Sequence, residues 1–310
     1  MEKYYITTPI YYVNDKPHIG HAYTTILADT ISRFRALIGE NPTFLTGLDE
    51  HGLKVQQAAE KNGKAPQDHC DSMAPAFIDL WKKLNINYSD FIRTTEHRHT
   101  KIVQQILTKV HESGDIYMDE YEGWYSISEE RFITEKELDS GQFGEVKQIK
   151  EKNYFFRMSK YQATLIDKIE KDELLIQPKS RKNEVLGFLK NELSDLCISR
   201  PKSRLEWGIE LPFDDSYVTY VWFDALINYI SAIGAYSNDE HFSSLWPADV
   251  HLIGKDILTT HSVYWPTMLL SLGLPLPQRI FAHGWWLTDD QKMSKSCLLY
   301  TSPSPRDQAK

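Results

Sequence analysis

The stretch "YYITTPIYYVNDKPHIGHAYTT", residues 4–25, contains the end of one structural element and the start of the next. Residues 3–12 are rich in Tyr, Ile and Thr, which favour a β-strand. Pro17 is typical of a first helical turn, where its missing N–H is tolerated. Over residues 19–34 apolar side chains recur every three or four positions, and Gly39 follows as a stop. The segment therefore predicts a strand, a turn and a helix in succession.

A second unit follows the same plan. Residues 42–52, "PTFLTGLDEHG", predict a short buried strand that runs into Asp49, and residues 53–62 predict a helix that Gly63 ends. Strands that alternate with helices favour a parallel sheet covered by helices on both faces. The sequence therefore predicts an α/β fold with a Rossmann-like, doubly wound parallel sheet.

Residues 115–210 differ in character from the segment before them. They contain acidic, glycine-punctuated short segments such as "YEGWYSISEERF", which are typical of β-hairpins. Strand-like runs return at residues 217–230, 249–258 and 278–286. We therefore predict a first half of the Rossmann domain at 1–114, an insertion at 115–210, the second half at 211–296 and a disordered tail at 297–310.

Composition excludes several classes of protein. The 310 residues carry a formal net charge of −8, so no basic field indicates a nucleic-acid partner. The three cysteines lie far apart without CxxC spacing, which disfavours a disulfide framework and a zinc knuckle. The N-terminus lacks the basic and apolar regions of a leader peptide, and no apolar stretch approaches the roughly 20 residues of a membrane span. We expect a cytoplasmic protein without membrane contact.

Two histidines mark the predicted start of the first helix. In open parallel sheets ligands bind outside the carboxyl ends of the strands, where a helix N-terminus attracts anions. His18 and His21 lie on the first turn of such a helix, so their rings can donate hydrogen bonds to phosphate oxygens. Gly20 between them lets a flat base approach the backbone. The alternative is a pair of ordinary turn histidines.

A second candidate motif, "QKMSKS", occupies residues 291–296. Lys292 and Lys295 in this short loop could close over a polyphosphate as mobile positive charges. The alternative is a solvated basic loop. The chain contains no GxxxxGK[ST] or GxGxxG motif that would compete for phosphates and no HExxH motif that would indicate a metalloprotease.

"HIGH" and "KMSKS" together are the two signatures of class I aminoacyl-tRNA synthetases, and the stretches around them resemble the methionyl-tRNA synthetase family. The matching stretches are "TTPIYYVNDKPHIGHAYTTILADTISRFRAL", "FLTGLDEHGLKVQQAA", "YVWFDALINYI", "LIGKDI" and "HGWW". The resemblance covers about residues 3–296. It implies that the Rossmann-like sheet is split by a connective-peptide insertion.

The resemblance also implies a two-step reaction. L-methionine and ATP, accompanied by Mg²⁺, give methionyl-adenylate and pyrophosphate, and the acceptor end of tRNA(Met) then takes the methionyl group. Because the substrate carboxylate is itself the nucleophile, the enzyme positions the substrates and stabilises charge. The residues implied in that role are His18, His21, Lys292 and Lys295.

By the same resemblance, the nucleotide would contact Gly20, Arg200, Glu210, Gly254 and Asp256, with Glu210 and Asp256 at the ribose. The methionine site would comprise Ile10, Tyr12, Asp49, Trp222, Ala225, Tyr229 and His261. Asp49 would pair with the ammonium group, three of the aromatic residues would form a wall suited to a thioether, and His261 would lie near the sulfur. The alternatives are surface ion pairing for Arg200, Glu210 and Asp256, and core packing for the aromatic residues.

The chain departs from the family at Leu196 and Thr260, where relatives have aromatic residues, and in two larger features. Many relatives carry a zinc knuckle that begins with CxxC where this chain has Ser126 and Glu129, so we predict no structural zinc. After Ser296 the family continues into a helical domain that reads the anticodon, whereas here a Ser- and Pro-containing tail follows. We expect a truncated catalytic region without anticodon contacts, with weak methionine activation, very poor tRNA charging and a non-native junction at residues 297–310.

Three other hypotheses stay open at this point. The chain could be a synthetase for another apolar amino acid, or a small nucleotidyltransferase with a similar histidine pair. It could also be a catalytically inert fragment that binds ATP or a partner. Amino-acid-dependent activity distinguishes a methionine enzyme, a synthetase for another apolar amino acid and a nucleotidyltransferase.

Overall fold

The computed structural model describes residues 2–126, 131–133, 138, 146–285, 287–288 and 291–292. Glu129, Lys295 and the tail at 297–310 lie outside the described residues. The predictions made for them therefore stay predictions.

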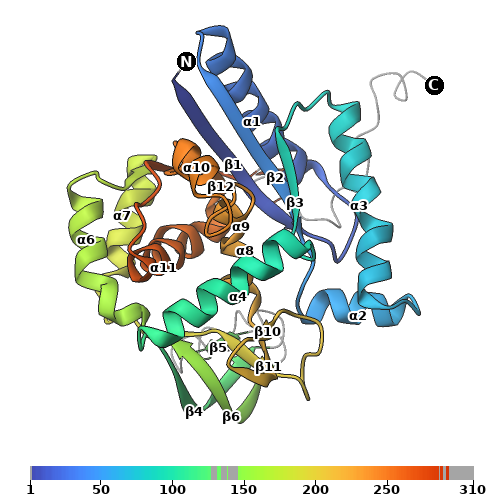
Figure 1. Ribbon diagram of the computed structural model, residues 1–310, viewed down its shortest axis with the longest axis vertical. Coiled ribbons are helices and arrows are strands. Elements are labelled where there is room, and N and C mark those ends of the chain that lie inside the picture. The colour runs from blue at the N-terminus through green and yellow to red at the C-terminus, as the bar shows by residue number, and fades with distance from the viewer. Residues whose placement is uncertain are drawn as a thin grey trace.

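A six-stranded sheet forms the centre of the molecule, in the order β3-β2-β1-β12-β13-β7, and every neighbouring pair is parallel (Figure 1). Its strands are β1 (Lys3–Tyr12), β2 (Asn41–Asp49), β3 (Asp90–Arg93), β7 (Leu175–Gln177), β12 (Val250–Gly254) and β13 (Arg279–His283). From β1 the chain builds outward through β2 and β3, and it later returns to the opposite side of β1 with β12. This reversal confirms the doubly wound parallel sheet, and it places the topological switch point between β1 and β12.

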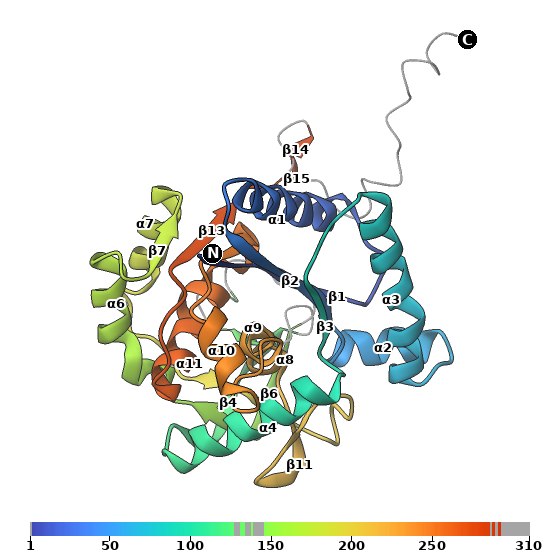
Figure 2. The same cartoon turned by 45° about the horizontal axis from the view of Figure 1, so that its top comes forward.

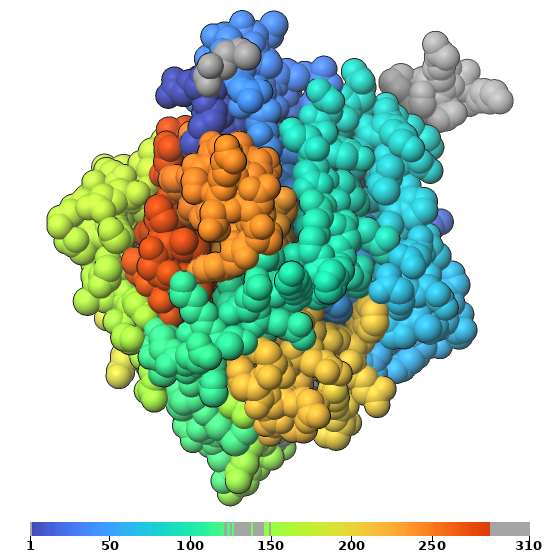
Figure 3. All heavy atoms as spheres, viewed as in Figure 1, coloured from blue at the N-terminus to red at the C-terminus, as the bar shows by residue number. Residues whose placement is uncertain are grey.

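The helices follow the predicted alternation in the first part of the chain, where the predicted helices at 19–34 and 53–62 correspond to the first two. The α-helices are α1 (Ile19–Leu37), α2 (Leu53–Lys61), α3 (Pro66–Lys83), α4 (His97–Glu112), α6 (Gln162–Glu170), α7 (Lys179–Phe188), α8 (Val221–Leu226), α9 (Asn228–Ser231), α10 (Asp239–Leu245) and α11 (Trp265–Leu272). In the space-filling view α4 crosses the middle of one face, between α10 and the segment that carries β9–β11 (Figure 3).

Alternate residues of β1 point to opposite faces of the sheet, as strand geometry requires. Tyr4 and Ile6 pack with Ala28 of α1, whereas Tyr5 joins the larger core that includes Phe223 and Trp265. Helices therefore cover both faces, with α1 on one side and the helices α4, α8, α9 and α11 on the other (Figure 2). This two-sided burial explains why the strands read as nearly continuous apolar runs.

Two smaller antiparallel sheets occupy the predicted insertion and its end. One has the order β5-β4-β6-β8 and the other β10-β11-β9. Their strands are β4 (Ile116–Ser126), β5 (Arg131–Ile133), β6 (Val146–Phe156), β8 (Leu196–Cys197), β9 (Ser199–Pro201), β10 (Glu210–Leu211) and β11 (Asp214–Thr219). Pairing of β4 with β6 confirms the predicted hairpin character. A further short pair, β14 (Leu287–Thr288) and β15 (Gln291–Lys292), follows β13.

The structure differs from the prediction in three details. β7 lies inside the predicted insertion yet forms an edge strand of the central sheet, and the boundary at residue 210 falls within β10. The run at 217–230, predicted as strand-like, is a strand only to Thr219 and then becomes α8 and α9. α8 and α9 are buried almost throughout, including their polar residues Asp224, Asn228 and Ser231, so they lack the exposed polar face of an amphipathic helix.

No helix among the described residues is both long enough and apolar enough to cross a membrane.

Candidate active site

The two histidines of "HIGH" cap the start of α1. His18 is the N-cap residue, and its Nδ1 accepts a hydrogen bond from the Gly20 N–H at 3.1 Å. His21 Nδ1 accepts from the His18 N–H at 3.3 Å, which completes a reciprocal capping box. The two rings stack with their centroids 3.7 Å apart, and the His21 ring packs on Tyr11 at 4.7 Å. Both imidazoles are therefore held by the backbone of the helix they begin.

This arrangement fixes which nitrogen carries the proton. A ring nitrogen that accepts a hydrogen bond from an N–H group bears no proton, so the neutral imidazole carries its proton on Nε2. Both His18 and His21 therefore present Nε2–H donors at a helix N-terminus, where the helix dipole also favours an anion. The absence of a side chain at Gly20 matters here, because an added Cβ would lie 3.0 Å from Cε1 of His18.

The histidine pair is joined to the other half of the sheet. Thr24, on the first turns of α1, places its Oγ1 2.7 Å from Nε2 of His283 at the end of β13. A Cβ added at Gly254, the last residue of β12, would lie 3.7 Å from Cε1 of the same histidine. The start of α1 thus meets the carboxyl ends of β12 and β13 at the switch point, where open α/β sheets bind ligands.

Asp256 lies beside this junction. Its Oδ1 accepts a hydrogen bond from Trp285 Nε1 at 3.2 Å, and Lys255 Nζ lies 3.7 Å from the centroid of the Trp285 ring. Asp256 itself is exposed. The segments that carry Asp256 and Trp285, 29 residues apart in sequence, are therefore joined to each other just beyond the ends of β12 and β13.

A second group of predicted residues gathers at the ends of β1 and β2. Asp49 ends β2 and is 7% exposed, and its carbonyl accepts from the Val13 N–H at 3.3 Å. Tyr12 ends β1, and its hydroxyl oxygen would lie 2.6 Å from a Cβ added at Gly52. Gly52 also has φ 107°, which L side chains rarely adopt. The Tyr12 hydroxyl therefore packs against the loop that follows Asp49.

Tyr229 and His261 form a buried pair. The tyrosine hydroxyl lies 2.6 Å from His261 Nε2, and His261 Nδ1 lies 2.9 Å from the Ile257 carbonyl. Since a carbonyl only accepts, Nδ1 carries the proton and Nε2 accepts from the tyrosine. Burial lowers the pKa of His261 to about 4 and raises the pKa of Tyr229. The pair is therefore uncharged at neutral pH.

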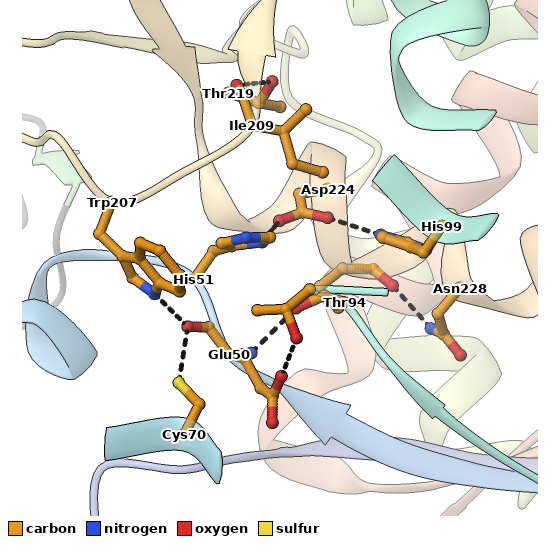
Figure 4. Close-up of polar contacts among 12 residues, drawn as sticks. Glu50, His51, Cys70, Thr94, His99, Trp207, Ile209, Thr219, Asp224 and Asn228 are labelled. Atoms are coloured by element: carbon orange, nitrogen blue, oxygen red, sulfur yellow. Dashed lines mark hydrogen bonds and ion pairs between the residues drawn. The ribbon is translucent and has the colours of Figure 1, made fainter. Parts of the chain in front are cut away.

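The remaining predicted methionine-site residues lie on β1 and α8. Ile10 is partly buried against the core that contains Tyr229. Trp222 is half-buried and Ala225 is buried, both on α8. His51, two residues beyond Asp49, is bonded to Asp224 of α8 through Nδ1 and Oδ2 at 2.7 Å (Figure 4). That bond joins the loop after β2 to the helix that carries Trp222 and Ala225.

Comparison with known proteins decides the family. The sequence profile described as "tRNA synthetases class I (M)" matches residues 4–142 and 139–304. This chain belongs to the class I tRNA synthetases of that family.

Individual relatives agree. The chain is 49% identical to the methionine–tRNA ligase of Halalkalibacterium halodurans over 97% of its length and 48% of the relative's. It is 50% identical to the methionine–tRNA ligase of Thermotoga maritima over 95% and 48% of the two lengths. The chain thus spans about half the length of the curated relatives it matches.

Solved structures agree as well. The Mycobacterium tuberculosis methionyl-tRNA synthetase in complex with methionyl-adenylate has a TM-score of 0.90 and 43% identity, covering 96% of this chain and 60% of that one. The apo form of the same enzyme has a TM-score of 0.77 and 40% identity, covering 92% and 56%. The present structure is therefore more similar to the adenylate complex than to the free form.

Two predicted nucleotide residues of this class I synthetase have protein partners of their own. Glu210 is exposed on β10, where its Oε1 forms an ion pair with Lys202 Nζ at 2.6 Å. Among the described residues no hydrogen bond or ion pair joins it to Asp256. Arg200 is buried, donates to the Ser199 carbonyl at 2.6 Å and lies 4.2 Å from the Tyr220 ring centroid. Both contacts are of the kind that ordinary ion pairing and packing produce.

One of the two motif lysines, and one of the two positions that bear on zinc, lie among the described residues. Lys292 belongs to β15, and Lys295 lies outside the described residues. Ser126 is buried at the end of β4. Within the described part of the chain no group of three or more His, Cys, Asp or Glu side chains could hold a metal ion.

Sequence reasoning missed a buried polar network that the structure reveals beside the site (Figure 4). Asp224 accepts from His51 and from His99, each at 2.7 Å, and its carboxylate is fully buried. Burial alone would raise the pKa of Asp224, but its bonds and charge interactions with the two histidines lower it to about 2. A signal existed in the sequence, because a carboxylate inside the apolar run "VWFDAL" requires a buried partner.

A cavity of about 200 Å³ lies at the opposite end of the parallel strands, beside the amino ends of β1, β12 and β13. Its lining includes Lys3, Arg35, Arg279, Glu40 and Asp249. It lies away from the strand ends that carry the predicted site residues.

Proposed function

We propose that this chain activates L-methionine with ATP to form methionyl-adenylate and pyrophosphate, as the catalytic region of a methionine–tRNA ligase. The observation that carries the proposal is the capping box of His18 and His21, which engages Nδ1 of each ring at the start of α1 and leaves Nε2–H as the donor. The similarity of this chain to methionine–tRNA ligases, over nearly its whole length, supports the same reaction.

In the proposed step, the methionine carboxylate oxygen attacks the α-phosphorus of ATP and the bond to pyrophosphate breaks. Negative charge grows on the phosphate oxygens, where His18 and His21 donate hydrogen bonds and the α1 dipole adds a favourable field. Lys292 and Lys295 neutralise the departing pyrophosphate, and Mg²⁺ enters with ATP as part of the substrate. No protein nucleophile is required.

We assign the substrates to the two groups of residues described above. The adenosine lies against Gly20 and Gly254, with Asp256 at the ribose, and Glu210 and Arg200 are weaker candidates because each has protein partners. Asp49 binds the methionine ammonium. The side chain enters among Ile10, Tyr12, Trp222, Ala225 and Tyr229, with His261 near the sulfur. An uncharged Tyr229–His261 pair suits an uncharged, polarizable thioether.

The second step would transfer the methionyl group to the acceptor end of tRNA(Met) in the cytoplasm. Support for tRNA as a partner comes from the relatives, which are methionine–tRNA ligases. Anticodon recognition is assigned to no residue of this chain.

Methionine-dependent exchange of labelled pyrophosphate into ATP, measured on the purified chain without tRNA, tests the first step. We expect exchange with methionine but not with leucine or valine, and its loss in His21→Ala. Exchange with leucine or valine would instead indicate a synthetase for another apolar amino acid. No exchange from protein with a native near-ultraviolet circular dichroism spectrum would contradict the proposal and favour the inert fragment.

A further inference from the structure

We propose that Asp224 is a positioning residue that holds the ammonium-binding and side-chain-binding parts of the methionine pocket at a fixed separation. The inference rests on the proposed function, because it concerns the same pocket. It adds a residue to which the sequence assigned no role.

The geometry is a chain of four buried side chains. His51 Nδ1 lies 2.7 Å from Asp224 Oδ2, and His99 Nε2 lies 2.7 Å from Asp224 Oδ1. His99 Nδ1 in turn lies 2.7 Å from Ser231 Oγ. The four residues are at most 5% exposed. Since a carboxylate only accepts, both histidines direct N–H groups at Asp224.

These four residues come from three separate segments, and Figure 4 shows His51, His99 and Asp224 meeting. His51 belongs to the loop after β2, His99 to the first turn of α4, and Asp224 and Ser231 to α8 and α9. Proposed methionine contacts flank the network at each end. Asp49 precedes His51 by two residues, and Trp222 and Ala225 lie within two residues of Asp224. One carboxylate therefore connects the strand end that binds the ammonium to the helix that forms the side-chain wall.

Other bonds also hold the loop after β2 in place. Loss of the Asp224 bond should therefore change only the position of this loop relative to α8. Trp207 Nε1 donates to the Glu50 carbonyl at 2.5 Å, and the Glu50 carboxylate pairs with Arg93 at 2.7 Å. Neither bond reaches α8. Removing the charge on Asp224 should therefore leave the loop folded but allow α8 to shift relative to it.

Such a shift should affect methionine far more than ATP. Methionine spans the gap between Asp49 and α8, so a changed separation mispositions either its ammonium group or its thioether. ATP binds at the start of α1 and the ends of β12 and β13, which are joined by the separate Thr24–His283 contact. If Asp224 had a purely structural role, its replacement would weaken the binding of methionine and of ATP by similar factors.

The test is Asp224→Asn in the whole 310-residue chain, with the KM for methionine and the KM for ATP measured separately by pyrophosphate exchange. Asn is isosteric, and His51 can change tautomer to bond it, so we expect a folded protein. The KM for methionine should rise about tenfold or more while the KM for ATP stays within twofold. A rise of both by the same factor would overturn the inference.

Asp115→Asn is the matched control. Asp115 is also a buried carboxylate, bonded to Lys160, Tyr161 and Ser271, but it lies beyond the opposite end of α4. We expect a comparable loss of thermal stability with neither KM changed beyond twofold. If Asp115→Asn reproduced the selective rise in the KM for methionine, the effect would be a general result of destabilisation and the inference would fail.

A second pair of variants keeps the inference testable if Asp224→Asn does not fold. In His99→Gln the amide nitrogen can replace Nε2 as a donor to Asp224, whereas His99→Leu removes the donor. We expect His99→Gln to resemble the parent and His99→Leu to show the selective rise in the KM for methionine. Equal behaviour of the two variants would contradict the inference. A parent chain without any exchange would contradict the proposed function instead, since the comparison starts from measurable parent KM values.

Discussion

The start of α1 and the buried network around Asp224 use histidines in opposite ways. At α1, His18 and His21 are three residues apart, half-buried and bonded to the backbone of their own helix turn. Around Asp224, His51 and His99 are 48 residues apart and bonded to a carboxylate more than 120 residues further along the chain. The first arrangement presents donors to a ligand, and the second joins segments of the protein. Mutations in the two regions should therefore separate loss of rate from loss of stability.

The largest effect is expected from Asp224→Ala, on stability. Removing one partner of a buried charge network leaves His51 and His99 without their acceptor, which typically destabilises a protein by about 3–5 kcal/mol. Urea unfolding followed by tryptophan fluorescence measures the change. A loss below about 1 kcal/mol would mean that the network contributes little to holding its segments together.

The next largest effect should be on rate, at His21. Loss of one preorganised donor to a developing oxyanion lowers kcat by about 10²–10³-fold, so His21→Ala should lose that much exchange activity. The stability cost should be only about 1 kcal/mol, the usual value for a helix cap. A drop in stability as large as that of Asp224→Ala would remove the contrast between the two regions.

Two replacements at the same position separate the two roles of His21. Asn can keep the acceptor for the His18 N–H, and Gln can keep a donor near the position of Nε2. We expect His21→Asn to retain stability without activity, and His21→Gln to retain more activity than His21→Asn. If His21→Asn were the more active variant, the contribution of His21 to catalysis would come from its capping bond and not from its Nε2–H donor.

A pH effect of intermediate size should come from the buried region. The pKa of His261 is about 4 in the folded protein against 6.5 for the ordinary side chain, because burial disfavours the charged form. The unfolded chain therefore binds a proton first, and the stability contributed by the neutral histidine is lost as pH falls from 6.5 toward 4. Between pH 7 and pH 5 the loss is about 2 kcal/mol. His261→Gln should lack this component in urea unfolding at the two pH values, and an unchanged pH dependence would contradict it.

The smallest effect is expected at Gly20→Ala. The new Cβ would lie 3.0 Å from Cε1 of His18, so the ring must move by a few tenths of an ångström. Alanine's better helix propensity offsets part of the lost cap, so stability should change by less than about 1 kcal/mol. We expect roughly a tenfold loss of exchange activity, because the donor is displaced. Unchanged activity would show that the ring position is not critical.

The same contrast explains which features could be predicted from sequence. The strand, turn and helix around residues 4–25 depend on neighbours in sequence, and the structure has them where the pattern indicates. α8 was missed because a helix buried on nearly all sides lacks a polar face. β7 was assigned to the insertion because three residues carry too little pattern to identify an edge strand. The partners of Asp224 could not be identified, since contacts at such sequence separations leave no local trace.

For the predicted site residues, too, the sequence indicated which residues matter but not which side chains they contact. The residues near the ends of β1, β2 and β12 were assigned through a family resemblance, and in the structure Asp256 packs against Gly254, close to the His283 that Thr24 of α1 contacts. Glu210 is instead engaged with Lys202. A resemblance transfers residue identities, but a side chain's partners depend on its three-dimensional neighbours.

The capping box also defines what the histidine pair does not do. With Nδ1 of each ring accepting a main-chain N–H and Nε2 carrying the proton, neither neutral ring offers a lone pair to a substrate. To abstract a proton or ligate a metal through Nδ1, a ring would first have to release the first turn of α1. The pair is thus chemically restricted to giving hydrogen bonds. That restriction suits a reaction whose nucleophile, a carboxylate, is already ionised when it arrives.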